Sequence, residues 1–146
     1  MAFLLDTDTV SFLVKKNHTY HETVKAHVLR YSPEEVSISV FTECELMAGF
    51  HRISNEQTPY KQRVKTALDL LLTSLRVKIP SVLITEYYGK IRAGLTQVGQ
   101  DIGAMDCLIA AHAMSEELTL VTHNTVHFNR INQLGLGVIE LLDWTK

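Results

Sequence analysis

Short apolar or β-branched runs alternate with longer segments of helical periodicity along this chain, and this alternation restricts the fold strongly. It predicts strands at residues 2–5, 36–40, 76–79, 119–122 and 138–141, and helices at residues 7–16, 20–31, 42–52, 60–75, 82–98 and 106–118. Strands that alternate with helices form a parallel sheet covered by helices on both faces. We therefore expect an α/β fold. Because no repeat or linker interrupts the 146 residues, we expect one domain over residues 1–146.

Acidic and amide side chains lie where several of these apolar runs end or begin. The four positions are Asp6, Glu45, Asp106 and Asn124. The carboxyl ends of the strands in a parallel α/β sheet face one crevice, so side chains far apart in the sequence converge there. Carboxylates without a cationic partner repel one another, and a hard divalent cation with oxygen ligands removes that repulsion. The pattern predicts a metal site.

Each of the four residues also has a purely structural interpretation. Asp6 suits the N-cap of the following helix, and Glu45 suits the fourth position of a capping box that begins at Thr42. Asp106 lies in a first helical turn, where the helix dipole stabilises an anion, and Asn124 suits a turn after a strand. Any one residue is explained in this way, but four of them at successive elements favour a shared site.

The composition excludes several classes of protein. Hydrophobic residues make up 46% of the chain and charged residues 21%, as in ordinary globular proteins. No apolar run reaches the roughly 18 residues that span a bilayer, and no signal peptide is visible. The net charge of −2 argues against a generally basic nucleic-acid binder. Cys44 and Cys107 lie in apolar helical patterns, which predicts two buried thiols in a reducing, cytoplasmic setting. His112 is expected in the core.

Four segments resemble motifs of the PIN-domain family, particularly its VapC-type toxins of toxin–antitoxin pairs. Residues 3–8 (FLLDTD) are similar to the opening L-D-T-N, and residues 37–49 (SISVFTECELMAG) to I-S-x-x-T-x-x-E-L-x-x-G. Residues 102–113 (IGAMDCLIAAHA) resemble the most diagnostic segment, and residues 120–131 match L-V-T-x-[ND]-x-x-H-F-x-R-I. The resemblance covers essentially the whole chain in the right order.

This resemblance implies a metal-dependent endoribonuclease that cleaves RNA phosphodiester bonds with a metal-activated water, as the toxin of a toxin–antitoxin pair. Asp6, Glu45 and Asp106 match the three acidic positions of the family's metal site. Asn124 matches a fourth position, which is Asp in many relatives. The implied cofactor is Mg²⁺, with Mn²⁺ as the alternative, because both fit oxygen ligands.

Three further residues are secondary candidates by the same resemblance. Asp8 stands where the family usually has Asn and offers an extra oxygen, while Thr7 and Thr122 offer supporting hydroxyls. Because Asn124 removes one negative charge relative to relatives with Asp, we expect one permanent ion on the three matched acids. Any second ion would be recruited with the RNA.

The resemblance also implies partners. These are an RNA substrate, a cognate VapB-like antitoxin that covers the acidic site, and a second copy of the chain in a homodimer; no membrane is implied. The helix predicted at residues 82–98 carries Tyr87, Tyr88, Ile91 and Leu95 on one side. These four side chains suit either a partner surface or ordinary core packing.

Two other interpretations compete with the nuclease. The opening FLLDTDT also fits the hhhDxDxT motif of haloacid-dehalogenase-like phosphatases, with Asp6 as phosphoryl acceptor and Asp8 as general acid. That chemistry also requires a later lysine and a pair of acids, whereas Asp106 has no acidic neighbour in sequence. The remaining alternative is a non-catalytic protein-binding module whose acids only cap helices, which predicts no stabilisation by divalent cations.

Overall fold

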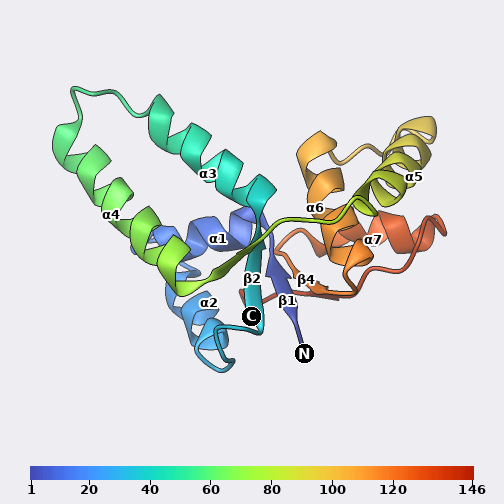
Figure 1. The fold of residues 1–146 in the computed structure, drawn as a ribbon, viewed down its shortest axis with the longest axis horizontal. Coiled ribbons are helices and arrows are strands. Elements are labelled where there is room, and N and C mark those ends of the chain that lie inside the picture. The colour runs from blue at the N-terminus through green and yellow to red at the C-terminus, as the bar shows by residue number, and fades with distance from the viewer.

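The computed structural model describes residues 1–146 and has a five-stranded sheet with helices on both faces (Figure 1). The strands are β1 (Phe3–Leu5), β2 (Val36–Ser39), β3 (Arg76–Lys78), β4 (Thr119–Val121) and β5 (Leu141–Leu142). Their order across the sheet is β3-β2-β1-β4-β5, and all neighbouring strands are parallel. The predicted fold class is confirmed.

Seven helices form the two outer layers. They are α1 (Thr7–Val14), α2 (His21–Val28), α3 (Val40–Arg52), α4 (Thr58–Ser74), α5 (Ile84–Gln97), α6 (Ala104–Ser115) and α7 (Thr125–Gln133). Figure 1 shows α1 to α4 on one side of the sheet and α5 to α7 on the other. None of the helices is both long enough and apolar enough to cross a bilayer.

The core has two halves because successive side chains of a strand point to opposite faces of the sheet. Leu4 belongs to one cluster, with buried residues of α5, α6 and α7. Phe3 and Leu5 belong to the other cluster, with buried residues of α1, α2 and α4. In α5, Ile91 and Leu95 are fully buried, which favours the core interpretation of these two side chains over a partner surface.

The register of the central strands aligns their carboxyl ends. Leu5 pairs with Ile38 of β2 on one side and with Val121 of β4 on the other. The chain then enters α1 on one face of the sheet after β1, and α7 on the other face after β4. Ligands of open α/β sheets bind at the point where the connections of two neighbouring strands diverge in this way.

The start of α3 differs from the prediction. The predicted capping box at Thr42 is wrong, because the helix begins at Val40 and Ser39 is its N-cap. The Ser39 hydroxyl accepts a hydrogen bond from the amide of Phe41 at 3.2 Å. Ser39 also contacts the ring of His112, which is fully buried as expected, at 2.8 Å. Thr42 therefore lies inside the helix.

Three other predictions need correction. The last strand, expected at residues 138–141, is Leu141–Leu142, because the side-chain amide of Asn132 bonds both the N–H and the C=O of Ile139. No helix was predicted from the sequence between residues 119 and 138, where α7 lies. Cys44 is exposed rather than buried, whereas Cys107 is buried; both are free thiols.

Gly103, directly before α6, has a backbone conformation that favours glycine, and a substitution there tests this preference. Gly103 is the N-cap of α6 with φ 96° and ψ 151°, a region that essentially only glycine adopts. No heavy atom lies within 4 Å of a Cβ added there. We expect Gly103→Ala to lower the free energy of unfolding by about 1–3 kcal/mol through backbone strain alone.

The matched control is Gly49→Ala, which also adds a Cβ into open space but lies within α3. Alanine at a helical position is expected to stabilise the protein by up to about 1 kcal/mol. Urea unfolding of both variants measures the two effects. Equal effects of the two substitutions would contradict the assignment of strain to Gly103.

Candidate active site

Asp6 directly follows β1 beside the end of β4, and both of its carboxylate oxygens are bonded. Its side chain is 2% exposed. Oδ1 accepts a hydrogen bond from the amide of Thr9 at 2.9 Å, which makes Asp6 the N-cap of α1. Oδ2 accepts one from the Thr122 hydroxyl at 2.6 Å. Asp6 is therefore the helix N-cap that the sequence suggested. The same carboxylate also accepts a hydrogen bond from Thr122.

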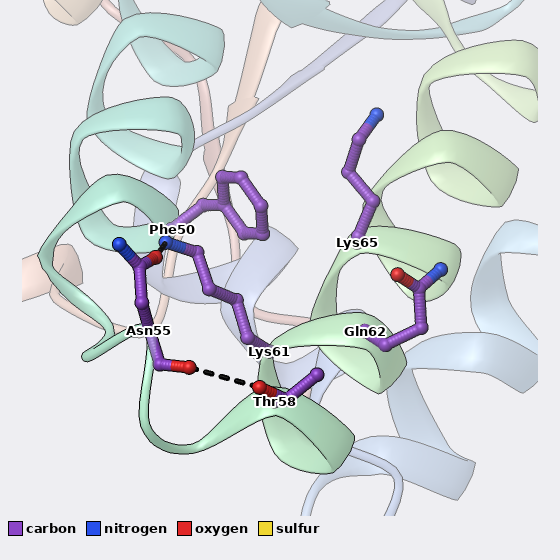
Figure 2. Close-up of a pocket in the computed structure, with 6 residues that line it drawn as sticks. All are labelled: Phe50, Asn55, Thr58, Lys61, Gln62 and Lys65. Atoms are coloured by element: carbon purple, nitrogen blue, oxygen red, sulfur yellow. Dashed lines mark hydrogen bonds between the residues drawn. The ribbon is translucent and has the colours of Figure 1, made fainter.

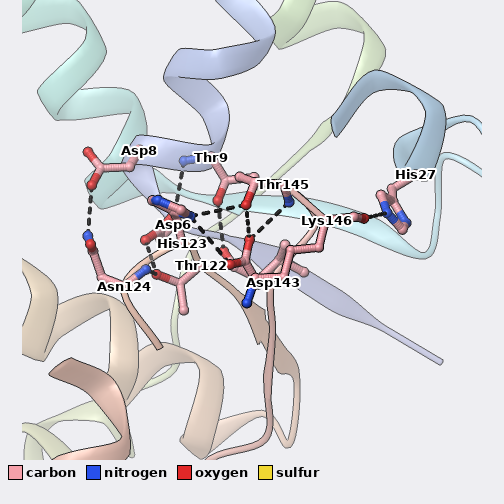
Figure 3. Close-up of polar contacts among 11 residues, drawn as sticks. Asp6, Asp8, Thr9, His27, Thr122, His123, Asn124, Asp143, Thr145 and Lys146 are labelled. Carbon is pink, nitrogen blue, oxygen red and sulfur yellow. Dashed lines mark hydrogen bonds and ion pairs between the residues drawn. The ribbon is translucent and has the colours of Figure 1, made fainter. Parts of the chain in front are cut away.

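The turn after β4 links Asp6 to Asp8. The Thr122 hydroxyl accepts a hydrogen bond from the backbone N–H of Asn124 at 2.9 Å. The side-chain amide of Asn124 donates to Oδ2 of Asp8 at 2.9 Å (Figure 3). Asn124 thus reaches from the N-terminus of α7 to the first turn of α1, and its neutral amide stabilises a carboxylate that an Asp at this position would repel.

Glu45 joins the site from α3. The hydroxyl of Thr7 donates to Oε1 of Glu45 at 2.5 Å. The hydroxyls of Thr7 and Thr42 lie 3.3 Å apart, and Thr42 is fully buried. Because the Thr7 proton is given to Glu45, the Thr42 hydroxyl is the donor in the second contact. Glu45 consequently faces α1 rather than the start of its own helix.

Asp106 lies in the first turn of α6, as expected, and its pKa is affected by the charges of the other acids. Burial, followed by the negative charges of Asp6, Asp8 and Glu45, raises the pKa of Asp106 from 3.8 to about 6. Burial also raises the pKa of Asp6, although hydrogen bonds from Thr122 and Thr9 oppose this shift. The charges of Asp6, Asp8 and Glu45 therefore act on Asp106, although no hydrogen bond joins Asp106 to these acids.

No cation balances this negative charge. None of the four acids forms a salt bridge with a lysine, arginine or histidine. The acids do not form a closed cage either, because no three His, Cys, Asp or Glu side chains lie close enough to hold an ion as they stand. An all-oxygen donor set of this kind fits Mg²⁺, which binds through one or two carboxylates and keeps waters for the rest of its shell.

Sequence reasoning missed two hydroxyl residues of the site. Thr9 donates its amide to Asp6 and its hydroxyl to the carbonyl of Val121 at 3.2 Å, which ties α1 to β4. Thr42 supports Thr7 from inside α3. The motif around residues 38–49 contains Thr42, but its spacing to Glu45 also fits a capping box, so the sequence pointed to the wrong role.

A hollow of about 400 Å³ lies away from the acids, between α3 and α4 (Figure 2). Phe50, Asn55, Lys61 and Lys65 are among the residues that line it. Its two ammonium groups already have partners: Lys61 donates to Asn55 at 2.9 Å, and Lys65 pairs with Asp69 at 3.0 Å. The group of acids at the carboxyl ends of the strands, and not this hollow, is the candidate active site.

Comparison with known proteins gives consistent results. Residues 3–134 match the PIN domain. The chain is 32% identical over 147 residues to Ribonuclease VapC1 of Haemophilus influenzae strain R2866, with 100% of both chains covered. It is 30% identical over 131 residues to the tRNA(fMet)-specific endonuclease VapC of Salmonella typhimurium, covering 90% of this chain and 92% of the relative. The solved structure of VapBC2 from Rickettsia felis, bound to a DNA fragment from their promoter, superposes with a TM-score of 0.78 at 30% identity over 99% of both chains.

The raised pKa of Asp106 predicts how stability depends on pH without divalent ions. Between about pH 4 and pH 6 the folded state holds this proton more tightly than the unfolded chain, so the free energy of unfolding falls as the pH rises. We expect Asp106→Asn to be more stable than the wild type at pH 7.5 by about 1–2 kcal/mol after solvent screening. The difference should vanish near pH 4, where the carboxylate is neutral.

Urea unfolding in EDTA across this pH range measures the effect. Asp69→Asn is the matched control, because Asp69 forms an exposed pair with Lys65 and its loss should cost little at any pH. A destabilised Asp106→Asn protein at pH 7.5 would show that Asp106 is held by attractive contacts and not against repulsion.

Proposed function

Because this chain belongs to the PIN-domain family, and within it to the VapC type, we propose that it is a metal-dependent endoribonuclease and the toxin of a toxin–antitoxin pair. The observation that carries this proposal is the unbalanced group of Asp6, Asp8, Glu45 and Asp106 at one edge of the sheet. An all-oxygen acidic site supports divalent-cation binding. A bound cation in turn offers the positive charge that an RNA phosphate needs in order to approach four carboxylates.

The proposed metal ligands are Asp6, Asp106 and Glu45, with Mg²⁺ as the ion and Mn²⁺ as the alternative. When bound, the ion supplies an activated water and neutralises charge that develops on the phosphodiester. The chain itself fixes the ligands: hydroxyl and amide donors hold Asp6, and the Thr7 hydroxyl holds Glu45. Neutral donors of this kind orient carboxylates without competing with a cation for their charge.

The partners follow from the relatives. We propose a VapB-like antitoxin that covers the acidic site, because the Rickettsia felis structure is a VapBC complex. The homodimer stays a proposal as well; the exposed Val82 and Leu83, which precede α5, and the partly exposed Tyr87 offer apolar surface for such contacts. Initiator tRNA is the first defined substrate to try, because the Salmonella relative is named as specific for it.

The alternatives explain less of the site. The phosphatase interpretation requires a lysine at the acids, and no lysine forms an ion pair with Asp6, Asp8 or Asp106. A binding-only module gives no reason for gathering four unpaired carboxylates. The PIN-domain match and the ribonuclease relatives favour the nuclease.

Substitutions in the site should separate the three interpretations. We expect Asp6→Asn and Asp106→Asn to lower the rate of Mg²⁺-dependent RNA cleavage by at least about 100-fold, the scale on which electrostatic groups act in active sites. Asp8→Asn should be milder, because Asp8 is held by Asn124 and is not a proposed ligand. The measurement is the cleavage rate of a mixed RNA pool and of initiator tRNA, with Mg²⁺ or Mn²⁺ and with EDTA.

Asp69→Asn again serves as the control and should cleave like the wild type. The phosphatase interpretation would be favoured if Asp8→Asn lowered activity as much as Asp6→Asn and the wild type hydrolysed phosphate monoesters. A folded wild type that neither cleaves RNA nor gains thermal stability from Mn²⁺ would favour the binding module. Cleavage of the RNA pool without cleavage of initiator tRNA would support the nuclease and exclude only initiator tRNA as its substrate.

The number of ions depends on Asn124. We expect the wild type to bind one Mn²⁺ tightly in the absence of RNA, because Asn124 is neutral and already donates to Asp8. Asn124→Asp should add a second Mn²⁺ and, without metal, should destabilise the fold by about 1 kcal/mol through repulsion from Asp8. Titration calorimetry measures the stoichiometry, and two equally tight ions on the wild type would contradict the single-ion proposal.

A further inference from the structure

Four rings from three segments gather beside the acids into what we call the aromatic cluster. Phe12 comes from α1, His18 and Tyr20 come from the segment between α1 and α2, and His123 comes from the turn after β4. Phe12 and His18 are stacked with their centroids 4.5 Å apart, and Tyr20 lies 5.2 Å from Phe12 and 5.0 Å from His123. The cluster therefore joins α1 to the turn that carries the site.

The aromatic cluster is fixed in place before any ligand binds. Phe12 and Tyr20 pack against the buried core below them. Nδ1 of His18 accepts a hydrogen bond from the amide of Tyr20 at 3.1 Å. Nδ1 of His123 lies 3.1 Å from the hydroxyl of Thr145 (Figure 3). The side chain of His123 nevertheless stays 39% exposed, so an ordered ring is open to solvent.

The position of His123 connects the aromatic cluster to the acids. It lies between Thr122, which donates to Asp6, and Asn124, which donates to Asp8. Figure 3 shows these side chains together around the end of β4. The exposed ring of His123 therefore belongs to the same turn as the two residues that bond Asp6 and Asp8.

The charges around the aromatic cluster suit a polyanion. Lys15 and Lys16 lie in the same segment as His18, are exposed, and form no ion pair. One acid contacts the cluster: Oδ2 of Asp143 lies 3.3 Å from Nδ1 of His123, while its Oδ1 accepts hydrogen bonds from the amide and hydroxyl of Thr145. Lys15 and Lys16 thus add two exposed, unpaired ammonium groups to the segment that carries His18 and Tyr20.

We propose that the aromatic cluster binds an unpaired nucleobase next to the scissile phosphate, while Lys15 and Lys16 contact the adjoining RNA backbone. This inference rests on the proposed ribonuclease function. Proteins recognise single-stranded RNA by stacking splayed bases on aromatic side chains, including histidine. Such stacking strengthens binding by about 5- to 100-fold, whereas a base inside a duplex presents no free face.

Binding of a fluorescein-labelled, unpaired oligoribonucleotide tests the proposal, with the Asp106→Asn protein used to prevent cleavage. We expect His18→Ala and His123→Ala, each added to that protein, to weaken binding by about 5- to 100-fold in fluorescence anisotropy. His123→Phe keeps a ring but loses the contacts with Thr145 and Asp143, so it should bind nearly as well as the parent. A fully paired duplex of the same length should lose little affinity in any variant.

The matched control is His51→Ala, which removes another exposed histidine from an aromatic pair, with Phe50, near the far end of α3. It should leave RNA binding unchanged. Urea unfolding of each variant shows that the folded fractions are equal. If loss of binding in His123→Ala is not restored in His123→Phe, the hydrogen bonds of His123 and not its stacking are responsible, and the proposal is overturned.

Two outcomes separate this inference from the proposed function. RNA cleavage by the wild type, with unchanged binding and cleavage in His18→Ala and His123→Ala, overturns the base site and leaves the nuclease intact. The same is true if these variants bind RNA normally but lose a VapB-like antitoxin, because the aromatic cluster would then belong to the protein partner. A wild type that neither binds nor cleaves RNA overturns both.

Discussion

The register of the three central strands determines where every polar group of the site lies. Leu5 pairs with both Ile38 and Val121, so the residues that follow these three strands meet at one edge of the sheet. A slip of one residue would move each buried side chain to the opposite face. Phe3 and Leu5 pack into one apolar layer and Leu4 into the other, which resists such a slip. The packing of the two layers thus sets the geometry of the acids.

The acids are held together by groups that leave their charge intact. Thr9 and Thr122 donate to Asp6, Thr7 donates to Glu45, and Asn124 donates to Asp8. A lysine or arginine at any of these positions would lower the repulsion among the acids more strongly, because an ion pair removes the repulsion that a hydroxyl only moderates. It would also take up the charge that a divalent cation needs. The raised pKa of Asp106 reflects this compromise.

Much of the fold and the site is predictable from the sequence, because both follow from local patterns. The alternation of apolar runs predicted the parallel sheet, and the acids at strand ends predicted which residues converge. The errors arose where a side chain competes with the backbone. Ser39 took the N-cap that Thr42 was expected to provide, and Asn132 bonded Ile139 in place of a neighbouring strand. Such bonds depend on three-dimensional placement, which spacing does not reveal. The ring contacts of His18 and His123 were invisible for the same reason.

The double use of Asp6 has an evolutionary consequence. Its carboxylate caps α1 as well as facing the acidic site, so most replacements would disturb the helix and the site together. Asparagine is the exception, since it caps helices as well as aspartate does while carrying no charge. A single base change that converts the Asp6 codon to an asparagine codon would give an inactive chain whose surface is preserved. In a cell that also carried the intact copy, the inactive chain would compete with it for the proposed antitoxin, so that loss of activity in one copy would free the other copy from inhibition.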